Sequence, residues 1–385
     1  MSKISPKLFY ETLRDSGVEF YTGVPDSLLK SFCYYINETL NNDQHIIAAN
    51  EGSALALGIG HHLSTGNVPL IYLQNSGLGN LVNPLLSLSD KDVYSIPGIL
   101  MIGWRGEPET RDEPQHKKQG RITLDLLDVM EIPYRVLDSK MNNDQVKKEV
   151  EACVTKSKSE NQIYALVVKK DFFEKYSIKQ EESKYLLSRE KAIDLVIKNS
   201  NVDRGDIYVC TTGLPSRELY ELRSKQGKFL DHDFLVVGGM GHANQIALGI
   251  AISQPDRRVI CLDGDGAIIM HMGSMTTIGS SKQKNLFHIV LNNGAHDSVG
   301  GQKTTAFDVN LSDIAKNTGY ENVFSVSNEE DLVKTLNTIR DLNGPIFLEI
   351  RLKKGWRAEI GRPSTTPEEN KTSFMHHLSK KLNYD

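Results

Sequence analysis

The sequence predicts an α/β protein with two open parallel sheets in tandem. At 385 residues the chain is too long for one average domain, and two domains of about 150 to 200 residues are expected. Short runs rich in Val and Ile alternate with longer amphipathic segments, which is typical of βα units around a parallel sheet. A polar stretch interrupts this alternation near the middle. We therefore predict a first domain over residues 1–172, a linker over 173–188 and a second domain over 189–385.

The apolar runs predict strands in both halves, with helices between them. In the first half, strands are predicted at 18–22, 45–49, 68–73, 98–103, 134–138 and 163–168. In the second half, they are predicted at 206–211, 233–238, 258–263, 286–292 and 345–351. The last 25 residues begin GRPSTTPEENK and are polar, so we expect a tail or a flap outside the core.

Composition narrows the class of partner. The net charge is −4 and the charged residues are interspersed, so neither nucleic acid nor an anionic membrane is an expected partner, and a small molecule is. The amino terminus is charged and no apolar run is long enough to span a membrane, which favours a cytoplasmic protein. The four cysteines form no CxxC pair, and we expect them to be reduced and packed in the cores.

The stretch RVICLDGDGAIIMHMG, residues 258–273, predicts a ligand site. A buried strand ends there in two acids and two glycines, and a helical pattern follows. Ligands of open α/β sheets bind at the carboxyl ends of strands. Glycines at such a place allow backbone amides to approach a phosphate, whereas the carboxylate of Asp265 would repel it unless a cation intervened. Asp265 therefore favours a metal site.

A second oxygen ligand is expected nearby, because Mg²⁺ takes about six oxygen ligands. The next strand ends in Asn292-Asn293-Gly294, one βα unit further on, and adjacent parallel strands would bring these amides beside Gly264-Asp265-Gly266. Each motif alone is most often a simple turn. The two together at this spacing are much more specific for a Mg²⁺ site.

The stretch GDGAIIMHMGSMTTIGSSKQKNLFHIVLNN resembles the diphosphate-binding motif of thiamine-diphosphate enzymes. The resemblance implies that Asp265, Asn293 and the backbone carbonyl of Ala295 bind Mg²⁺, while the amides of Gly266 and Ala267 hold the diphosphate. It also implies a pyrimidine-binding domain followed by a diphosphate-binding domain. The middle domain of the larger decarboxylases of this family would be missing.

Three further stretches fit the same family. Glu51, in IIAANEGSALALGIG, would by itself be an ordinary glutamate at a helix start, where the dipole favours a carboxylate. The resemblance implies instead that Glu51 bonds N1′ of the aminopyrimidine and promotes the tautomer that removes the C2 proton. In FLVVGGMGHANQ, the implied cofactor contacts are Met240 and Gly241; in TTGLPSRE they are Thr212 and Gly213.

Within this family, GVPDSLLK, LQNSGLGNLVNPLLSL, GWRGEP, DEPQHKKQG and LNNGAHDSVGGQ resemble decarboxylases of phosphonopyruvate, and also those of sulfopyruvate. The resemblance implies decarboxylation of 3-phosphonopyruvate to phosphonoacetaldehyde and CO₂ in phosphonate biosynthesis. Sulfopyruvate or another short 2-oxo acid is the alternative substrate. A catalytically silent paralogue would have lost Glu51, Asp265 or Asn293, and all three are present. A dinucleotide-dependent oxidoreductase is disfavoured, because no GxGxxG follows the first predicted strand.

The remaining candidates would move protons or bind substrate. Histidine suits proton transfer near neutral pH, and His116 and His296 lie in the family-like loops. A phosphonate calls for cationic and neutral donors. The substrate candidates are Asp26, Ser27, Asn75, Arg105, Lys117 (or its neighbour Lys118) and Lys303 with Thr304.

Two expectations concern the surface and the assembly. The pairs His61-His62 and His376-His377 lack spaced partners and are expected to be surface residues rather than metal ligands. The glycine-rich loop NNGAHDSVGGQKTT is expected to close over the substrate. The resemblance implies a homodimer or a larger homo-oligomer with active sites between subunits.

Overall fold

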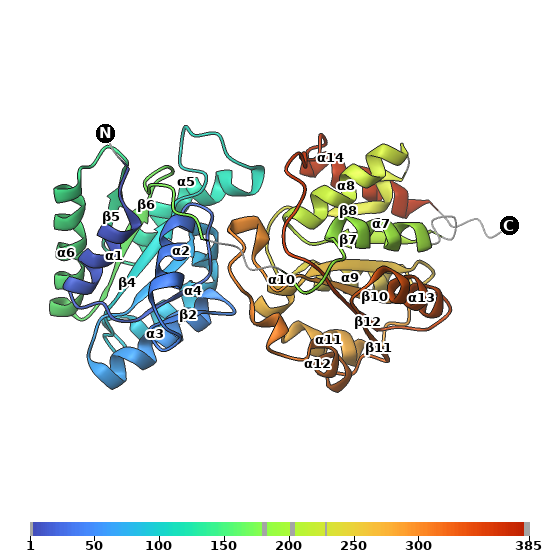
Figure 1. Cartoon of the computed structure of the whole chain (residues 1–385), viewed down its shortest axis with the longest axis horizontal. Coiled ribbons are helices and arrows are strands. Elements are labelled where there is room, and N and C mark those ends of the chain that lie inside the picture. The colour runs from blue at the N-terminus through green and yellow to red at the C-terminus, as the bar shows by residue number, and fades with distance from the viewer. Residues whose placement is uncertain (1–2, 179–182, 201–204, 228, 381–385) are drawn as a thin grey trace. The chain divides into compact units, whose positions relative to one another are not determined.

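The computed structural model describes residues 3–178, 183–200, 205–227 and 229–380. The chain divides into two compact units, Met1–Gln180 and Glu181–Asp385. Each unit contains a six-stranded parallel sheet with flanking helices (Figure 1). This arrangement confirms the predicted α/β class with two parallel sheets in tandem.

The first sheet has the strand order β2-β1-β3-β4-β6-β5. Its strands are β1 (Tyr21–Gly23), β2 (His45–Ile47), β3 (Leu70–Gln74), β4 (Gly98–Gly103), β5 (Tyr134–Leu137) and β6 (Ile163–Val168). The helices of this unit are α1 (Pro6–Asp15), α2 (Lys30–Thr39), α3 (Glu51–Thr65), α4 (Leu78–Pro84), α5 (Pro114–Val129) and α6 (Asn143–Glu160), with short helical turns η1 (Asn75–Gly77) and η2 (Leu85–Ser89). All six strands were predicted from the sequence.

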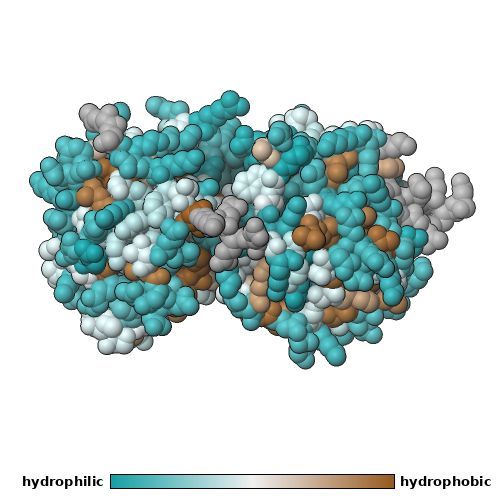
Figure 2. All heavy atoms as spheres, in the orientation of Figure 1, coloured by the Kyte–Doolittle hydropathy of each residue, from teal (hydrophilic) through white to brown (hydrophobic). Residues whose placement is uncertain are grey.

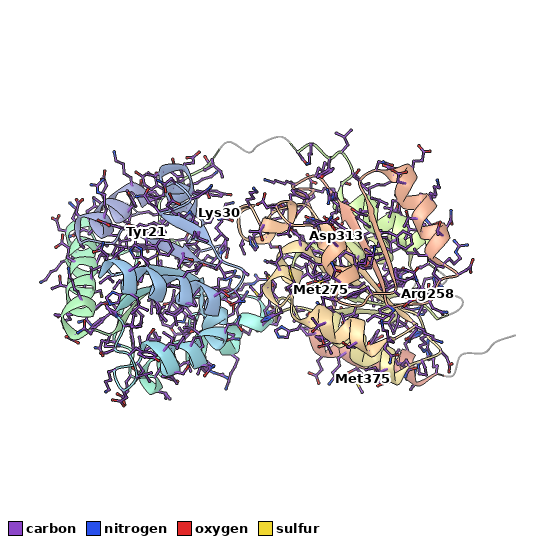
Figure 3. All side chains as sticks on the ribbon, turned by 90° about the horizontal axis from the view of Figure 1, so that it is seen from below. Tyr21, Lys30, Arg258, Met275, Asp313 and Met375 are labelled. Carbon is purple, nitrogen blue, oxygen red and sulfur yellow. The ribbon has the colours of Figure 1, made fainter. Side chains whose placement is uncertain are left out.

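Two apolar clusters form the core of the first unit, as expected for a sheet covered by helices on both faces. Tyr21, labelled in Figure 3, belongs to one of them and is 1% exposed. Phe172 and Phe173 pack edge-on against Phe9 in the same cluster. These two aromatic residues, at the predicted boundary with the linker, therefore lie in the core of the first unit.

The second sheet has the order β11-β12-β10-β9-β7-β8. Its strands are β7 (Ile207–Cys210), β8 (Asp233–Leu235), β9 (Val259–Gly264), β10 (Leu286–Asn292), β11 (Asn322–Val326) and β12 (Ile346–Arg351). The helices are α7 (Arg189–Asn199), α8 (Leu214–Gln226), α9 (Ala243–Ser253), α10 (Asp265–Met270), α11 (Ser274–Ser281), α12 (Leu311–Asn317), α13 (Glu329–Ile339) and α14 (Pro367–Ser379), with short turns η4 (Leu230–His232), η5 (Asp297–Val299) and η6 (Thr305–Phe307).

Strand β11 was missed in the sequence. It is an edge strand that pairs only with β12, and its burial pattern is mostly intermediate, so its residues are not the continuous apolar run of a central strand. The predicted helix after residue 266 is also divided. α10 ends at Met270, and α11 begins at Ser274; Met275 (Figure 3) is buried in the core of this unit.

The expectation of a tail or a flap at the carboxyl terminus was wrong. Residues 367–379 form α14, whose amino terminus carries a capping box between Thr366 and Glu369. Phe374 is 3% exposed, and the Asn370 side chain bonds both the amide of Leu235 and the carbonyl of Asp233. One polar and one apolar side chain thus attach the helix to β8, within a segment whose composition alone indicates a loop.

The surface of the protein and the burial of its cysteines are as expected from the amino-acid composition. In the described part of the chain, no helix is long and apolar enough to cross a membrane. Hydrophilic side chains predominate on the face of the molecule in Figure 2, with scattered hydrophobic ones. Cys33, Cys153, Cys210 and Cys261 are free and buried, which confirms their predicted place in the cores.

Candidate active site

The segments that follow four strands of the second unit lie at the carboxyl edge of its sheet. They follow β7, β8, β9 and β10, and contain Thr212, Met240, Asp265 and Asn293 respectively. β7 lies between β8 and β9, so the strand order reverses at this point of the sheet. Crevices at such reversals are the usual ligand sites of open α/β sheets. The structure therefore brings the predicted cofactor residues of this unit to one edge.

Asp265 follows β9 directly and is 3% exposed. The Thr304 hydroxyl donates to Asp265 Oδ2 at 2.5 Å. Burial raises the pKa of the Asp265 carboxyl to about 6, although the hydrogen bond from Thr304 opposes this effect. A carboxylate at such depth is costly unless a positive charge accompanies it. The chemistry of Asp265 thus suits a metal ligand, and it gives Thr304 a role in holding that ligand.

The glycine after Asp265 is required by close packing. A Cβ at Gly266 would lie 2.9 Å from the His296 ring, which is tighter than side chains tolerate. Gly241, which has φ +86°, is similar: its Cβ would lie 2.6 Å from the His271 ring and 2.9 Å from the carbonyl oxygen of Ala267. Gly266 thus leaves room for the His296 ring, and Gly241 lets the backbone of Ala267 approach closely.

Asn293 ends up beside Asp265 because of strand register. Leu291 of β10 pairs with Gly264 of β9, so the residues that follow each strand lie at the same level of the sheet. Asn293 is 3% exposed and its Oδ1 accepts the amide of Ala295 at 3.2 Å. Asn292, by contrast, donates to Glu349 at 2.6 Å and is a structural residue of the sheet. Asp265 and Asn293 offer the oxygen ligands that suit Mg²⁺.

A hairpin over residues 294–304 covers this edge. Ala295 and Lys303 form a bridge, and the amide of His296 donates to the carbonyl of Gln302 at 2.8 Å. The hairpin places His296 against Gly266 and the Ser298 hydroxyl 2.6 Å from the position of a Cβ at Gly213. Burial lowers the pKa of His296 to about 4, so its imidazole is neutral near pH 7.

Two further contacts shape the loops after β7 and β8. The Thr212 hydroxyl donates to the carbonyl of Val237 at 2.8 Å, which ties the two loops together. Gly213, with φ +96°, precedes α8 and leaves room for Ser298. The side chain of Gln302 is 3% exposed and has no hydrogen-bond partner among the described residues. Gln302 was not predicted as a site residue, although it ends the family-like stretch LNNGAHDSVGGQ.

In the first unit, Glu51 is buried at the start of α3. It is 5% exposed, and the Asn80 side chain donates to Glu51 Oε2 at 2.7 Å. Burial raises the pKa of Glu51, while the bond from Asn80 lowers it. Gly77 packs directly against Glu51 Oε1, where a Cβ would clash with the carboxyl group. Asn80 and Gly77 were missed as site residues, although both lie in the family-like stretch LQNSGLGNLVNPLLSL.

A second group of polar side chains surrounds Arg105 at the carboxyl edge of the first sheet. Its guanidinium pairs with Asp112 through two nitrogens and donates from Nη1 to the Ser27 hydroxyl at 2.9 Å. Against the effect of burial, this pair holds the pKa of Asp112 well below its usual range. Asn75 bonds both the amide and the carbonyl of Arg105, at 3.0 and 2.8 Å. Asn75 therefore fixes the backbone of Arg105.

Asp26 completes this group. It is fully buried, and it accepts hydrogen bonds from the amide of Leu28 and from Gln74 Nε2, both at 2.8 Å. Burial raises the pKa of Asp26. Of the other predicted residues, Ser27 and Asn75 bond Arg105 directly, and Asp26 interacts with its charge.

The other predicted residues differ in burial and in their contacts. His116 is half-buried, and burial together with the charge of Arg105 lowers its pKa, so its ring is neutral near pH 7. The backbone of His116 packs against Gly106, beside Arg105. Lys117 is exposed in the first turn of α5, and Lys303 is exposed and pairs with Asp308 at 3.0 Å. Neither lysine is drawn into the contacts described above.

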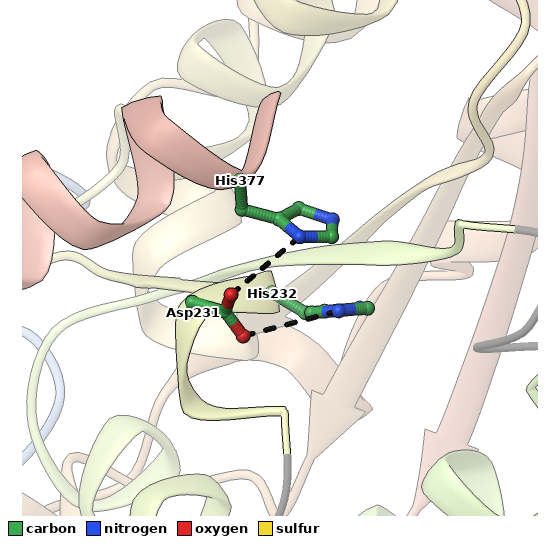
Figure 4. Close-up of side chains that lie close together, drawn as sticks. All are labelled: Asp231, His232 and His377. Carbon is green, nitrogen blue, oxygen red and sulfur yellow. Dashed lines mark ion pairs between the residues drawn. The ribbon is translucent and has the colours of Figure 1, made fainter. Parts of the chain in front are cut away.

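His377 departs from its predicted surface position, whereas its neighbour His376 is exposed. His377 of α14 is 9% exposed and its ring lies 3.7 Å from that of His232, between centroids; both face Asp231 (Figure 4). Arg257 donates to His377 Nε2 at 3.2 Å, which leaves the ring hydrogen on Nδ1, 3.6 Å from Asp231. That nitrogen has no lone pair for a metal, so the group anchors α14. His61 stacks on Phe20 and is half-buried.

Comparison with known proteins identifies the two units. Residues 6–130 match the N-terminal TPP binding domain of thiamine pyrophosphate enzymes, and residues 212–350 match the C-terminal TPP binding domain. The matched domains follow each other without a third domain between them, as predicted.

Full-length relatives are similar across most of the chain. A phosphonopyruvate decarboxylase of Streptomyces viridochromogenes is 32% identical over 92% of this chain and 89% of its own length. One from Streptomyces hygroscopicus is 31% identical, over 94% and 91%. A sulfopyruvate decarboxylase of Methanosarcina acetivorans is 25% identical, over 96% and 97%. The chain therefore belongs to the thiamine pyrophosphate enzyme family, alongside these decarboxylases.

Proposed function

We propose that the protein catalyses the thiamine-diphosphate- and Mg²⁺-dependent decarboxylation of 3-phosphonopyruvate to phosphonoacetaldehyde and CO₂, a step of phosphonate biosynthesis. The observation that carries the proposal is the buried Asp265 beside Asn293 at the edge of a sheet, in a chain 31–32% identical to phosphonopyruvate decarboxylases. Thiamine diphosphate, when bound, supplies the electron sink that decarboxylation of a 2-oxo acid requires.

The second unit would hold the charged end of the cofactor. Asp265, Asn293 and the carbonyl of Ala295 are the proposed Mg²⁺ ligands. The amides of Gly266 and Ala267 would bind the diphosphate, which Gly266 permits because it has no side chain. The proposed contacts with the organic part of the cofactor are Thr212, Gly213, Met240 and Gly241.

Glu51 would hold a proton next to the aminopyrimidine. Its Oε2 accepts the bond from Asn80, so one carboxyl oxygen is fixed and the other, Oε1, is available to share a proton with N1′. The raised pKa of this buried carboxyl favours proton sharing near neutral pH. Asn80 and Gly77 would keep Glu51 in the orientation that this exchange needs.

His116 and His296 remain the proposed proton-transfer residues. The pKa of each imidazole is lowered by burial, so both rings are neutral near pH 7 and can accept a proton or donate a hydrogen bond. His296 lies at the diphosphate-binding turn, because it packs against Gly266.

The proposed substrate group is Asp26, Ser27, Asn75, Arg105, Lys117 and Lys303. Arg105 is the best supported of the cations, because its guanidinium is fixed by Asp112 and Ser27 in a plane that suits an anionic oxygen. Fixing a guanidinium in advance reduces the entropy lost when it binds an anion. Within this group, Asn75 would also hold Arg105 in place, because its side chain bonds the backbone amide and carbonyl of Arg105.

The substrate is tested by offering phosphonopyruvate, sulfopyruvate and pyruvate separately to the protein with thiamine diphosphate and Mg²⁺. The proposal expects the highest kcat/KM for CO₂ release from phosphonopyruvate. Faster turnover of sulfopyruvate would instead favour the alternative, to which the 25% identical relative points. No CO₂ from any of the three would favour a catalytically silent paralogue.

We also propose a homodimer or a larger homo-oligomer. Apolar residues are exposed on helices of both units: Leu57 and Leu63 of α3 are 39% and 72% exposed, and Ile252 of α9 is 54% exposed. Contact with another subunit would bury them. A cytoplasmic location stays a prediction of the sequence.

A further inference from the structure

We propose that Asp297 positions the amide of Asn293 for metal binding, and that Arg189 and Glu218 hold Asp297 in place for this purpose. This inference rests on the proposed function, since it assigns to Asn293 the role of a Mg²⁺ ligand. It concerns three charged residues that were not among the predicted site residues, although Asp297 and Glu218 lie in the family-like stretches LNNGAHDSVGGQ and TTGLPSRE.

Asp297 fixes the directions in which Nδ2 and Oδ1 of Asn293 point. Its Oδ2 accepts three hydrogen bonds, from Asn293 Nδ2 at 2.6 Å, from Arg189 Nη1 at 3.1 Å and from the amide of Gly355 at 3.1 Å. An ionised carboxylate only accepts hydrogen bonds, so the NH₂ group of Asn293 must point at it. The carbonyl oxygen then points to the other side, where it accepts the amide of Ala295 at 3.2 Å.

Asp297 and the amide of Ala295 therefore favour the same orientation of the Asn293 side chain. In this orientation Oδ1, and not the NH₂ group, is available to bind a metal. Oδ1 of Asn293 has a second lone pair, whereas an NH₂ group in its place has none to offer. The bond from Ala295 to Oδ1 also fixes the chain up to the carbonyl of Ala295, the third proposed ligand. Residues that orient metal ligands in this way commonly affect metal affinity.

Asp297 is itself held by a buried ion-pair network. Arg189, the first residue of α7, is 4% exposed, and Glu218 of α8 is 2% exposed. Arg189 donates from Nε and Nη2 to Glu218, at 2.7 and 3.1 Å, which leaves Nη1 for Asp297. The bidentate pair with Glu218 fixes the plane of the guanidinium and hence the direction of Nη1.

The charges of this network also suit a neighbouring cation. Among the described residues, Arg189 is the cation that pairs with both Glu218 and Asp297, so these two carboxylates carry more negative charge than this partner neutralises. Burying an unbalanced charge is costly unless an opposite charge lies near. Asp297 adds to the negative potential at Asp265, which a bound divalent cation would offset.

The test measures metal affinity directly, with Mn²⁺ as the probe. Full-length protein is incubated with a fixed saturating concentration of thiamine diphosphate, and free Mn²⁺ is followed by electron paramagnetic resonance. Asp297→Ala removes the acceptor for Asn293 Nδ2 and is expected to weaken Mn²⁺ binding about 10- to 100-fold. Asp297→Asn keeps an acceptor oxygen without the charge and is expected to retain most of the affinity.

Two controls separate orientation from other effects. Asp308→Ala removes an exposed carboxylate from the segment just after the same hairpin, where its bond is to Lys303, and is expected to leave Mn²⁺ affinity unchanged. In an Asn293→Ala background no amide remains to be oriented, so Asp297→Ala should weaken Mn²⁺ binding no further. If Asp297→Ala does not fold, Asp297→Ser replaces it with the same expectation, since the hydroxyl is too short to reach Asn293.

The outcomes are distinct. Equal losses in Asp297→Asn and Asp297→Ala would mean that the charge matters and not the orientation, and would overturn the inference. Wild-type affinity in Asp297→Ala, with Mn²⁺ binding still lost in Asp265→Ala, would also overturn it while leaving the proposed function intact. Wild-type protein that binds no Mn²⁺ with thiamine diphosphate would overturn the proposed function as well.

Discussion

At the scale of single residues, the hydrogen-bond partners of a buried acidic group decide what it can do. Asp263 and Asp265 look alike in LDGDGA, but both are buried and their partners differ. Asp263 accepts hydrogen bonds from Asn244 and the amide of Gly264, and it lies 3.2 Å from His288 Nε2. Asp265 has Thr304 as its side-chain partner. Asp263 is thus fully engaged by the protein, whereas Asp265 retains free lone pairs for a metal.

Glu51→Gln tests the proton role of Glu51. The amide keeps the shape and the place beside Asn80 but cannot exchange a proton, so CO₂ release is expected to fall about 10²- to 10⁴-fold. Binding of thiamine diphosphate, followed by quenching of intrinsic fluorescence, should change little. A variant that turns over as fast as the wild type would contradict the role assigned to Glu51.

Asp265→Ala, unlike Glu51→Gln, is expected to weaken cofactor binding. Loss of the carboxylate removes a charged metal ligand, so the concentration of Mg²⁺ needed for cofactor binding is expected to rise at least about tenfold. Titration of thiamine diphosphate at several Mg²⁺ concentrations measures this change. An unchanged Mg²⁺ requirement would exclude Asp265 as a ligand.

His45 gives a prediction about pH and stability. It is 9% exposed, bonds the Tyr72 hydroxyl at 2.9 Å, and burial lowers its pKa to about 4. Because the unfolded chain binds the proton more readily, with a pKa near 6.5, this histidine destabilises the fold as the pH falls from about 6.5 toward 4.

The effect of His45 can be isolated by substitution. Between pH 7 and pH 5 its contribution to the free energy of unfolding is expected to fall by about 2 kcal/mol. His45→Gln should reduce the acid sensitivity of urea unfolding by that amount, whereas His376→Gln, at an exposed position, should not. Equal acid sensitivity of wild type and His45→Gln would contradict the assignment.

At the scale of elements, the sequence predicted central strands well and edge elements poorly. β4 and β6 read as unbroken apolar runs and are fully buried, and their bounds were predicted correctly. β11 and α14 lie at the edge and on the face of the second sheet, where half-buried residues suffice. Their stability comes from tertiary contacts, to which local composition gives no guide.

The attachment of α14 is testable at Asn370. Its removal leaves the amide of Leu235 and the carbonyl of Asp233 without this partner, so Asn370→Ala is expected to destabilise the protein by about 1–3 kcal/mol. Lys371→Ala, one residue along at an exposed position, is the matched control and should change stability by less than about 0.5 kcal/mol. Urea unfolding measures both; equal values would contradict the proposed anchor.

At the scale of the whole molecule, the motifs predicted the family. The contacts between segments that are distant in the sequence could not be predicted from it. Asp265 and Asn293 were predictable, because a fixed strand-helix-strand unit separates them. The partners that orient the proposed site were not: Asn80 acts on Glu51 from 29 positions away, and Arg189 acts on Asp297 from 108. Such pairs are set by the packing of helices and loops on the sheet, which periodicity does not encode.

The central claim is that this chain releases CO₂ from a 2-oxo acid through thiamine diphosphate and Mg²⁺. It is tested most directly by stripping the protein of cofactors, adding phosphonopyruvate, and restoring thiamine diphosphate and Mg²⁺ singly and together. CO₂ and phosphonoacetaldehyde should form in equal amounts only when both are present, and Glu51→Gln should abolish most of that release. Release without thiamine diphosphate, or none when both cofactors are present, would contradict the account.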